Sequence, residues 1–341
     1  MKLSLPLFFT LAVMSAGSVF AQVNYNDVKQ DESTRPNIFQ RMNESGVLNN
    51  LDLSLNAGTT GLGLEVSSPI TEWARVRVGV DWMPRFDVPL YFDIQSYTDD
   101  GKINSSNFSK AQELMESLTG FEVDETVVMN GTPTMTQFKF LIDVYPFRSN
   151  RHWHFTAGFY AGSRQIAKAC NTIEEMPSLL AIGIYNRAYE FIKKTDFVDT
   201  PLDIPGYGDL YLDPDLADVL KEKFESFGRL GVHMGDYKNG TPYIMEPDKD
   251  GTLRARALVN AVRPYLGFGY GGALSSDKRW TGSFDVGAMI WGGSPDVITH
   301  DGVNMTTELD NVRGKVGTYL GLIKTMKVFP VVSLRIAYTL F

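Results

Sequence analysis

Histidine and serine are the side chains of this 341-residue chain that could most readily carry out chemistry. His152 and His154 lie two residues apart and would share one face of a strand, as a pair of metal ligands could. No Cys, His or Asp with suitable ligand spacing follows them, so we expect no metal. Ser163 could act as a nucleophile only if His233 or His300 approached it from a loop. The sequence therefore favours neither a catalytic site nor a cofactor.

Two further patterns resemble ligand-binding motifs without completing them. The Asp248–Gly251 segment has the beginning of a calcium-binding loop, but it lacks the further acidic ligands and the glutamate at fixed spacing. Gly267, Gly269 and Gly272 approach the spacing of dinucleotide-binding glycines, yet they lie inside an alternating run rather than between a strand and a helix. Both patterns are better explained as parts of hairpins.

Alternation with a period of two is the strongest signal in the chain, and it predicts β-strands. From 263 to 291, two runs of alternating bulky and small or polar residues flank a polar turn at 275–279, which predicts a hairpin. Similar runs occur at 62–82, 137–160 and 332–338. In each run one face is apolar, and the other carries glycine, polar or charged residues.

Tight turns between these strands alternate with long insertions at 87–133, 170–251 and 299–327. We expect helices at 106–118, 173–194, 214–227 and 308–323 within the insertions. Short turns at one end and long loops at the other are typical of an antiparallel up-and-down transmembrane β-barrel. Seven strands are clear, and bacterial barrels have an even number; the eighth would be Leu51–Ala57 or would lie within Val316–Met326.

The amino terminus and the composition restrict the function further. Residues 1–21 have the charge, apolar core and small-residue ending of a signal peptide, and 22–50 form a polar, flexible mature terminus. The barrel would then occupy 51–341. No later apolar run reaches the length of a membrane helix, and the net charge of -8 argues against a nucleic-acid partner. The single cysteine, Cys170, excludes an internal disulfide.

Strand phase predicts the environment of the aromatic and charged residues. All five tryptophans lie near strand ends, where they would mark the membrane interface, although Trp73 and Trp291 are out of phase with the apolar face. The set is Trp73, Trp82, Trp153, Trp280 and Trp291. The charged residues of the polar face would pair inside a narrow, filled barrel. They are Glu65, Arg75, Arg77, Asp81, Lys139, Asp143, Arg263, Asp285 and Arg335.

Several strand motifs resemble those of small outer-membrane β-barrel proteins of Gram-negative bacteria. They are GTTGLGLEVSSPI, VRVGVDW, FLIDVYPF, FTAGFY, RPYLGFGYG, SFDVGAMIWGGSPDV and FPVVSLRIAYTLF. The resemblance covers somewhat under half of the chain and omits the insertions. It implies the barrel fold and a bacterial outer-membrane location, and it carries over no catalytic residues.

The function expected from the sequence is that of a non-enzymatic outer-membrane barrel with a structural or surface-interaction role carried by its loops. Its partners would be outer-membrane lipid and an extracellular ligand or protein. A small channel or porin-like transporter is the main alternative. A lipid-modifying outer-membrane enzyme using Ser163 and a loop histidine, and a secreted soluble β-sandwich, are the others.

Overall fold

The computed structural model describes residues 50–98, 102–103, 108–194, 202–204, 208–210, 214–312 and 314–340. The expected signal peptide at 1–21 and nearly all of the terminus at 22–50 lie outside these residues. Within the described part of the chain, no helix has both the length and the apolar character needed to cross a membrane.

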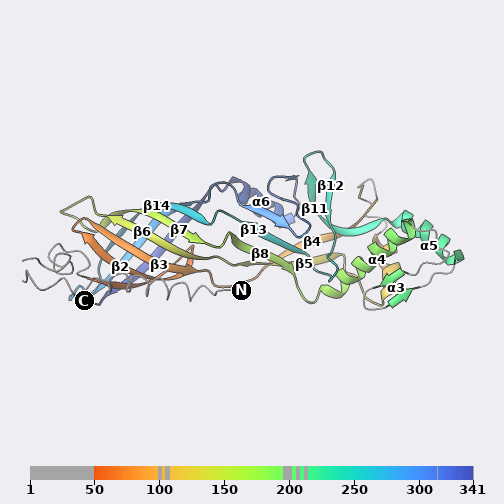
Figure 1. Cartoon of the computed structure of the whole chain (residues 1–341), viewed down its shortest axis with the longest axis horizontal. Helices are drawn as coiled ribbons and strands as arrows, with labels where there is room; N and C mark the ends of the chain where they lie inside the picture. Colours follow the sequence, from red (N-terminus) through yellow and green to blue (C-terminus); the bar gives the residue numbers. More distant parts are fainter. Residues whose placement is uncertain are drawn as a thin grey trace, which may run out of the picture. The chain divides into compact units, whose positions relative to one another are not determined.

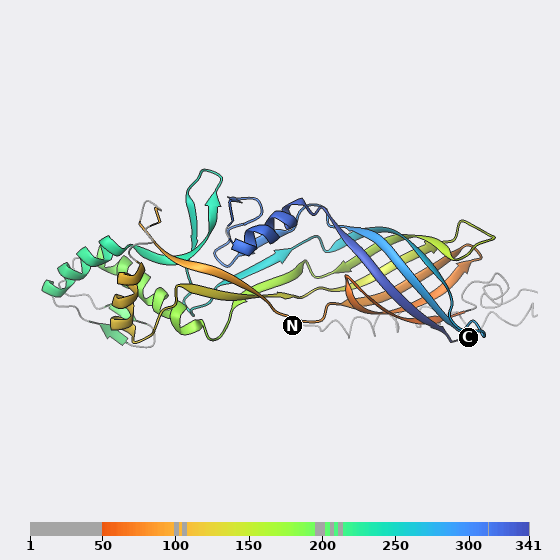
Figure 2. The same ribbon diagram turned by 180° about the vertical axis from the view of Figure 1, so that it is seen from behind.

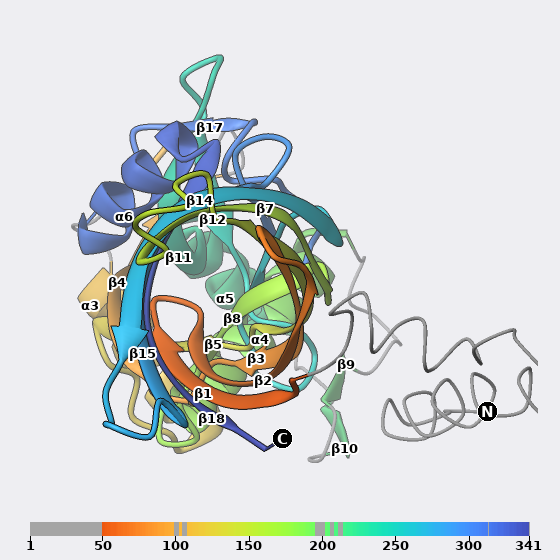
Figure 3. The ribbon, with the colours of Figure 1, turned by 90° about the vertical axis from the view of Figure 1, so that its left-hand side faces the viewer.

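Eight antiparallel strands close into a barrel in the order β1-β18-β15-β14-β7-β6-β3-β2, and Figure 3 looks along this ring. The strands are β1 (Asp52–Gly58), β2 (Gly61–Thr71), β3 (Ala74–Trp82), β6 (Thr136–Val144), β7 (Trp153–Gly162), β14 (Val262–Ala273), β15 (Trp280–Ile290) and β18 (Val328–Thr339). In Figure 2 the blue strands β14, β15 and β18 lie side by side. The predicted eight-stranded antiparallel barrel is confirmed. Its eighth strand is β1, whereas the alternative segment is largely the helix α6 (Gly314–Thr325).

Glycines let the strands approach a crowded interior. In the β14–β15 pair, Gly267 lies opposite Gly287, and both flank the ring of Tyr265. A Cβ atom at either glycine would clash with the Tyr265 hydroxyl oxygen. The small residues of the polar face therefore make room for large interior side chains.

The two ends of the barrel differ in their connections. Tight turns at 72–73, 145–152 and 274–279 lie at one end, which we call the turn end. The other end has one tight turn, at 59–60, and three long connections at 83–135, 163–261 and 291–327. We call it the sheet end, because these connections build a second sheet.

The second sheet continues five neighbouring barrel strands. Its order is β12-β11-β4-β5-β8-β13-β16, so β4, β5, β8, β13 and β16 follow the barrel order β3, β6, β7, β14 and β15 (Figure 1). Backbone hydrogen bonds bridge the gap: Met83 N to Met135 O, Thr134 N to Ile166 O and Val259 N to Arg164 O, each 2.8 Å. The strands are β4 (Val88–Tyr97), β5 (Thr126–Pro133), β8 (Gln165–Asn171), β11 (Arg229–Tyr237), β12 (Pro242–Met245), β13 (Arg254–Leu258) and β16 (Asp296–Thr299), with β17 (Leu309–Asp310) paired to β11. This sheet was not predicted from the sequence.

Three helices bury one face of the second sheet. They are α3 (Phe108–Thr119), α4 (Met176–Lys194) and α5 (Pro214–Phe227), and two short strands, β9 (Leu202–Ile204) and β10 (Gly208–Leu210), pair between α4 and α5. Met115, Ile182 and Phe224 from the helices share a core with Met129 and Leu230 from the sheet. The helix expected at 214–227 has the observed bounds. The one expected at 308–323 begins later because Leu309 and Asp310 form β17.

Candidate functional site

The outer surface of the barrel is an apolar band exposed to solvent. Leu266 is 61% exposed and Leu334 is 63% exposed, although both lie mid-strand. They belong to a larger set of exposed apolar side chains: Leu53, Leu55, Leu62, Leu64, Val66, Phe155, Phe159, Val262, Phe268, Phe284, Ile290, Val328, Val332 and Ile336. A soluble protein rarely leaves so large a continuous apolar surface uncovered.

Aromatic side chains concentrate at the edges of this band. At the turn end, Trp153 makes an edge contact with Tyr270 at 5.0 Å between ring centroids, and Trp280 contacts Tyr338 at 4.9 Å. Trp73, in the turn at 72–73, is exposed at the same end, and Trp82 is exposed at the sheet end. Aromatic girdles of this kind border the apolar band of transmembrane barrels.

Trp291 does not belong to this set, and its assignment as an interfacial aromatic is corrected here. It is 5% exposed and stacks on Phe329 with ring centroids 5.1 Å apart. Its position shares the inward phase of Asp285 and Met289, so its ring packs over the sheet end of the lumen.

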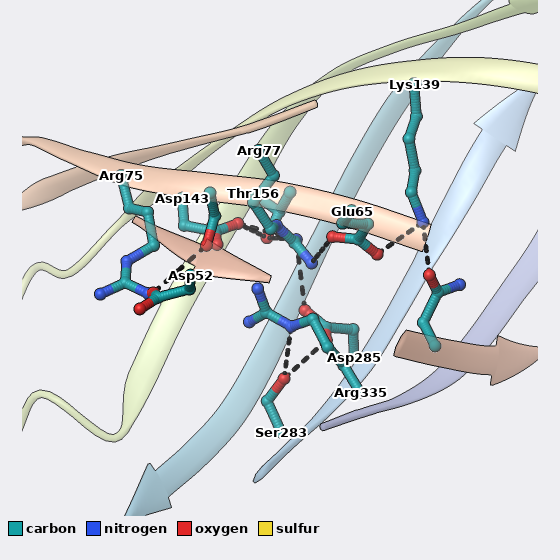
Figure 4. Close-up of polar contacts among 12 residues, drawn as sticks. Asp52, Glu65, Arg75, Arg77, Lys139, Asp143, Thr156, Ser283, Asp285 and Arg335 are labelled. Atoms are coloured by element: carbon teal, nitrogen blue, oxygen red, sulfur yellow. Dashed lines mark hydrogen bonds and ion pairs between the residues drawn. The ribbon is translucent and has the colours of Figure 1, made fainter. Parts of the chain in front are cut away.

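The lumen holds charged side chains that are almost fully removed from solvent (Figure 4). Arg77 lies among three carboxylates. Its Nη2 is 2.8 Å from Asp143 Oδ1 and 3.4 Å from Asp285 Oδ1, and its Nη1 is 3.7 Å from Glu65 Oε2. The same Nη2 donates to Thr156 Oγ1 at 3.3 Å. One guanidinium from β3 therefore joins β2, β6, β7 and β15 across the lumen.

Lys139 forms a second centre nearer the sheet end. Its Nζ lies 2.5 Å from Glu65 Oε1 and 2.6 Å from Asp81 Oδ1, and it donates to Asn56 Oδ1 at 3.1 Å. Glu65 lies between Lys139 and Arg77 and links the two centres into one network.

Two further predicted residues reach this network at the turn end. Arg75 forms an ion pair with Asp52, and Arg335 Nε donates to Ser283 Oγ at 2.9 Å. Ser283 Oγ in turn donates to Asp285 Oδ2 at 3.2 Å. Eight of the nine predicted interior residues therefore form ion pairs or hydrogen bonds inside the lumen. They are Glu65, Arg75, Arg77, Asp81, Lys139, Asp143, Asp285 and Arg335.

Arg263 lies apart from this network. It is fully buried at the sheet end, and its guanidinium donates to the backbone oxygens of Asn260 and Ser163 and, at 2.9 Å, to Gln137 Oε1. No carboxylate of the described residues lies within ion-pair distance of it. Arg263 therefore ties both ends of the 163–261 connection to the barrel wall, and it does not form the expected ion pair.

Several interior partners were not predicted from the sequence. Asp52 and Asn56 belong to β1, one of the two candidates for the eighth strand, and their alternation with Leu53 and Leu55 is a usable signal. His154 is buried, and its Nε2 is 2.8 Å from Asp285 Oδ1, so this histidine is part of the lumen network. Thr156 Oγ1 donates to Asp143 at 2.8 Å.

Large side chains fill the sheet half of the lumen. Tyr160 and Tyr265 meet edge to face at 5.5 Å, and Met289, Trp291 and Val331 pack with them. All five are at most 5% exposed. Side chains therefore occupy the barrel interior at this level, in addition to the ion-paired network.

A charged cluster outside the barrel holds the second sheet together. Arg229 Nη2 lies 2.6 Å from Glu246 Oε2, its Nη1 lies 2.5 Å from Glu190 Oε1, and Tyr97 donates to Glu246. Burial and the neighbouring Glu246 carboxylate raise the pKa of Tyr97 well above its ordinary value. Tyr97 thus stays a hydrogen-bond donor at physiological pH and links the end of β4 to Glu246, the residue that follows β12.

The remaining candidates for chemistry are scattered. Ser163 Oγ accepts a hydrogen bond from its neighbour Gln165 N at 3.1 Å. His233 is buried in β11, with its Nε2 3.3 Å from Asp236 Oδ1. Among the residues described, no group of three or more His, Cys, Asp or Glu side chains could hold a metal ion.

No family model matches the chain, and no curated protein matches it. Among solved structures, CarO2 of Acinetobacter baumannii shares 14% identity at a TM-score of 0.37, covering 85% of this chain and 98% of that one. CarO of the same organism shares 13% at 0.37, covering 85% and 97%. A major outer membrane protein of Thermus thermophilus shares 11% at 0.26, covering 85% and 98%. What this chain does must therefore be inferred from its own side chains.

Proposed function

We propose that this chain is an integral β-barrel protein of the bacterial outer membrane, non-enzymatic, whose filled barrel carries a rigid sheet for interactions at the cell surface. The observation that supports this proposal is the inverted polarity of the barrel. Leu266 and Leu334 are mostly exposed outside, whereas Arg77 and Asp143 are almost completely buried inside. A lipid surround explains both facts, because it favours the apolar exterior and leaves polar groups only the lumen.

Barrel closure supports the same proposal. Every backbone polar group in a membrane needs an internal partner, and a closed ring of eight paired strands leaves no open edge. In the orientation usual for such barrels, the tight turns face the periplasm and the long connections face outward. The second sheet would then stand on the cell surface.

The second sheet supports an interaction role rather than a catalytic one. Its strands continue the barrel wall and its core is well packed, so it would present a fixed surface to a ligand or protein. The Arg229 cluster adds polar cross-links between its elements. A rigid binding surface loses little conformational entropy when a partner binds, which favours affinity.

Because side chains fill the lumen, we predict that the barrel does not conduct ions. We expect native protein reconstituted in planar bilayers to show no steady conductance of porin size, because Arg77, Lys139 and their carboxylates occupy the interior. The amount of inserted protein is checked by heat-modifiable migration on a gel. A stable open channel from correctly inserted protein would overturn the filled-lumen proposal in favour of a transporter.

A further inference from the structure

We propose that the exposed face of the second sheet nearest the barrel binds the phosphorylated sugar headgroup of an outer-leaflet glycolipid. This inference rests on the membrane location proposed above and adds a ligand class and a site. The site is a surface cavity of about 420 Å³ between β5, β8 and the segment 85–87 that precedes β4. Arg85, Asp87, Thr132 and Lys168 are among the residues that line it.

The cavity lies on the same face of the wall as the lipid-facing side chains. Thr132, Thr134, Thr136 and Phe138 alternate along β5 and β6, while Met135 and Gln137 between them are buried. Phe138 belongs to the barrel exterior, so Thr132 lies on the same outer face, beyond the sheet end of the barrel. Thr136 pairs with the exposed Trp82, and Thr132 lies four residues further, about 13 Å along the strand. Headgroups just above the apolar band would reach this height.

Unpartnered cations gather on this face. Lys168 lies directly opposite Thr132 on one side and Arg256 on the other. Like charges in directly opposed positions destabilise a sheet. Both side chains are exposed, and within the described part of the chain neither has an ion pair or side-chain hydrogen bond. By contrast, Arg254 on the same strand is paired with Asp248 at 2.6 Å.

Arg85 adds a third cation from the segment between β3 and β4, and it too is exposed without an ion-pair partner among the described residues. Arg85 and Lys168 both line the cavity, and Arg256 lies directly opposite Lys168. A bound phosphate would relieve the repulsion between Lys168 and Arg256 and would accept hydrogen bonds from both. The geometry points to an anionic ligand.

Asp87 refines the ligand class. Its carboxylate lines the same cavity and accepts a hydrogen bond from Thr132 Oγ1 at 2.5 Å. A ligand made only of phosphate would be repelled by it, whereas a sugar hydroxyl could donate to its second oxygen. Phe86 in the cavity wall is 54% exposed and offers an apolar contact. Phosphate, hydroxyl and apolar groups occur together in a phosphorylated glycolipid.

The test is a binding titration of the full chain in detergent micelles with three probes. They are purified lipid A bearing its phosphates, the same lipid after phosphate removal, and soluble glucosamine 1-phosphate. The variant Lys168→Gln with Arg256→Gln removes the opposed cations. The control, Lys238→Gln with Lys278→Gln, removes two exposed lysines elsewhere. Heat-modifiable migration confirms that each protein is folded.

We expect native protein and the control to bind phosphorylated lipid A alike, and the Lys168/Arg256 variant to bind it about tenfold more weakly or worse. Removing the lipid phosphates should weaken native binding similarly, a comparison that needs no variant. Equal binding by the variant, or indifference to the phosphates, would overturn the proposal. Equally tight binding of soluble glucosamine 1-phosphate would overturn the lipid source. A protein that is soluble without detergent would instead refute the membrane location itself.

Discussion

Replacing Arg77 by Met is expected to destabilise the folded barrel by about 3–5 kcal/mol, because it leaves three buried carboxylates without their shared cation. Asp143, Asp285 and Glu65 all lie within 3.7 Å of the Arg77 guanidinium, and none is more than 3% exposed. Methionine keeps much of the volume of the arginine stem, so the loss would report the charge rather than a cavity. Urea titration of the protein in lipid vesicles, followed by tryptophan fluorescence, would measure it.

Arg75→Met is the matched control for this loss. Arg75 also faces the lumen and pairs with Asp52, but its side chain is 26% exposed at the turn end. Asp52 also keeps hydrogen bonds from Thr339 at 2.7 Å and Ser67 at 3.4 Å, so the expected cost is about 1–2 kcal/mol. Equal costs for the two substitutions would contradict a central role for Arg77.

A second substitution tests how the charges are coupled. Adding Asp143→Asn to Arg77→Met removes one of the uncompensated carboxylates, so the double variant should be more stable than the sum of the two single losses predicts. Simple additivity of the two losses would show that Arg77 and Asp143 do not depend on each other, despite their 2.8 Å separation.

The second large effect is expected on the outside of the barrel. Leu266→Arg should cost about 2–4 kcal/mol in a bilayer, because it places a charge on the lipid-facing surface near mid-strand. Leu274→Arg in the neighbouring turn is the control, since the two leucines have nearly equal exposure, 61% and 64%. In water both substitutions would be nearly neutral. In the bilayer, Leu274→Arg should cost only about 0–1 kcal/mol, because the turn lies near the membrane interface. The same urea titration would compare them, and equal small effects would argue against a lipid surround.

Much of the barrel was predictable because strand phase alone fixes which side chains share a face. Alternation placed Glu65, Arg77 and Asp143 inside and Leu266 outside without any knowledge of partners. It could not say that Arg77 meets Asp285 from β15, since that contact depends on barrel closure and register. Nor could it show that Arg263 donates to the backbone oxygens of Asn260 and Ser163 rather than to a carboxylate, because backbone acceptors leave no trace in the residue pattern.

The second sheet escaped prediction for a different reason. Several of its strands are short, and β13 has only five residues, Arg254–Leu258, too few for a clear alternation. Yet β4 did carry a signal, because Phe92 and Ile94 are buried while Tyr91 and Asp93 are exposed. Strand pairing with the extended barrel wall, rather than local propensity, decides the structure of the remaining segments.

Cysteine labelling in intact cells tests most directly whether this barrel spans the outer membrane. In a Cys170→Ser background, cysteine would be placed by Lys238→Cys in the β11–β12 turn, Lys278→Cys in the turn before β15, or Leu266→Cys on the barrel exterior. A membrane-impermeant maleimide should label the first in intact cells, the second only after the outer membrane is permeabilised, and the third only after denaturation. Labelling at 278 in intact cells, or at 266 without denaturation, would contradict the membrane-spanning barrel.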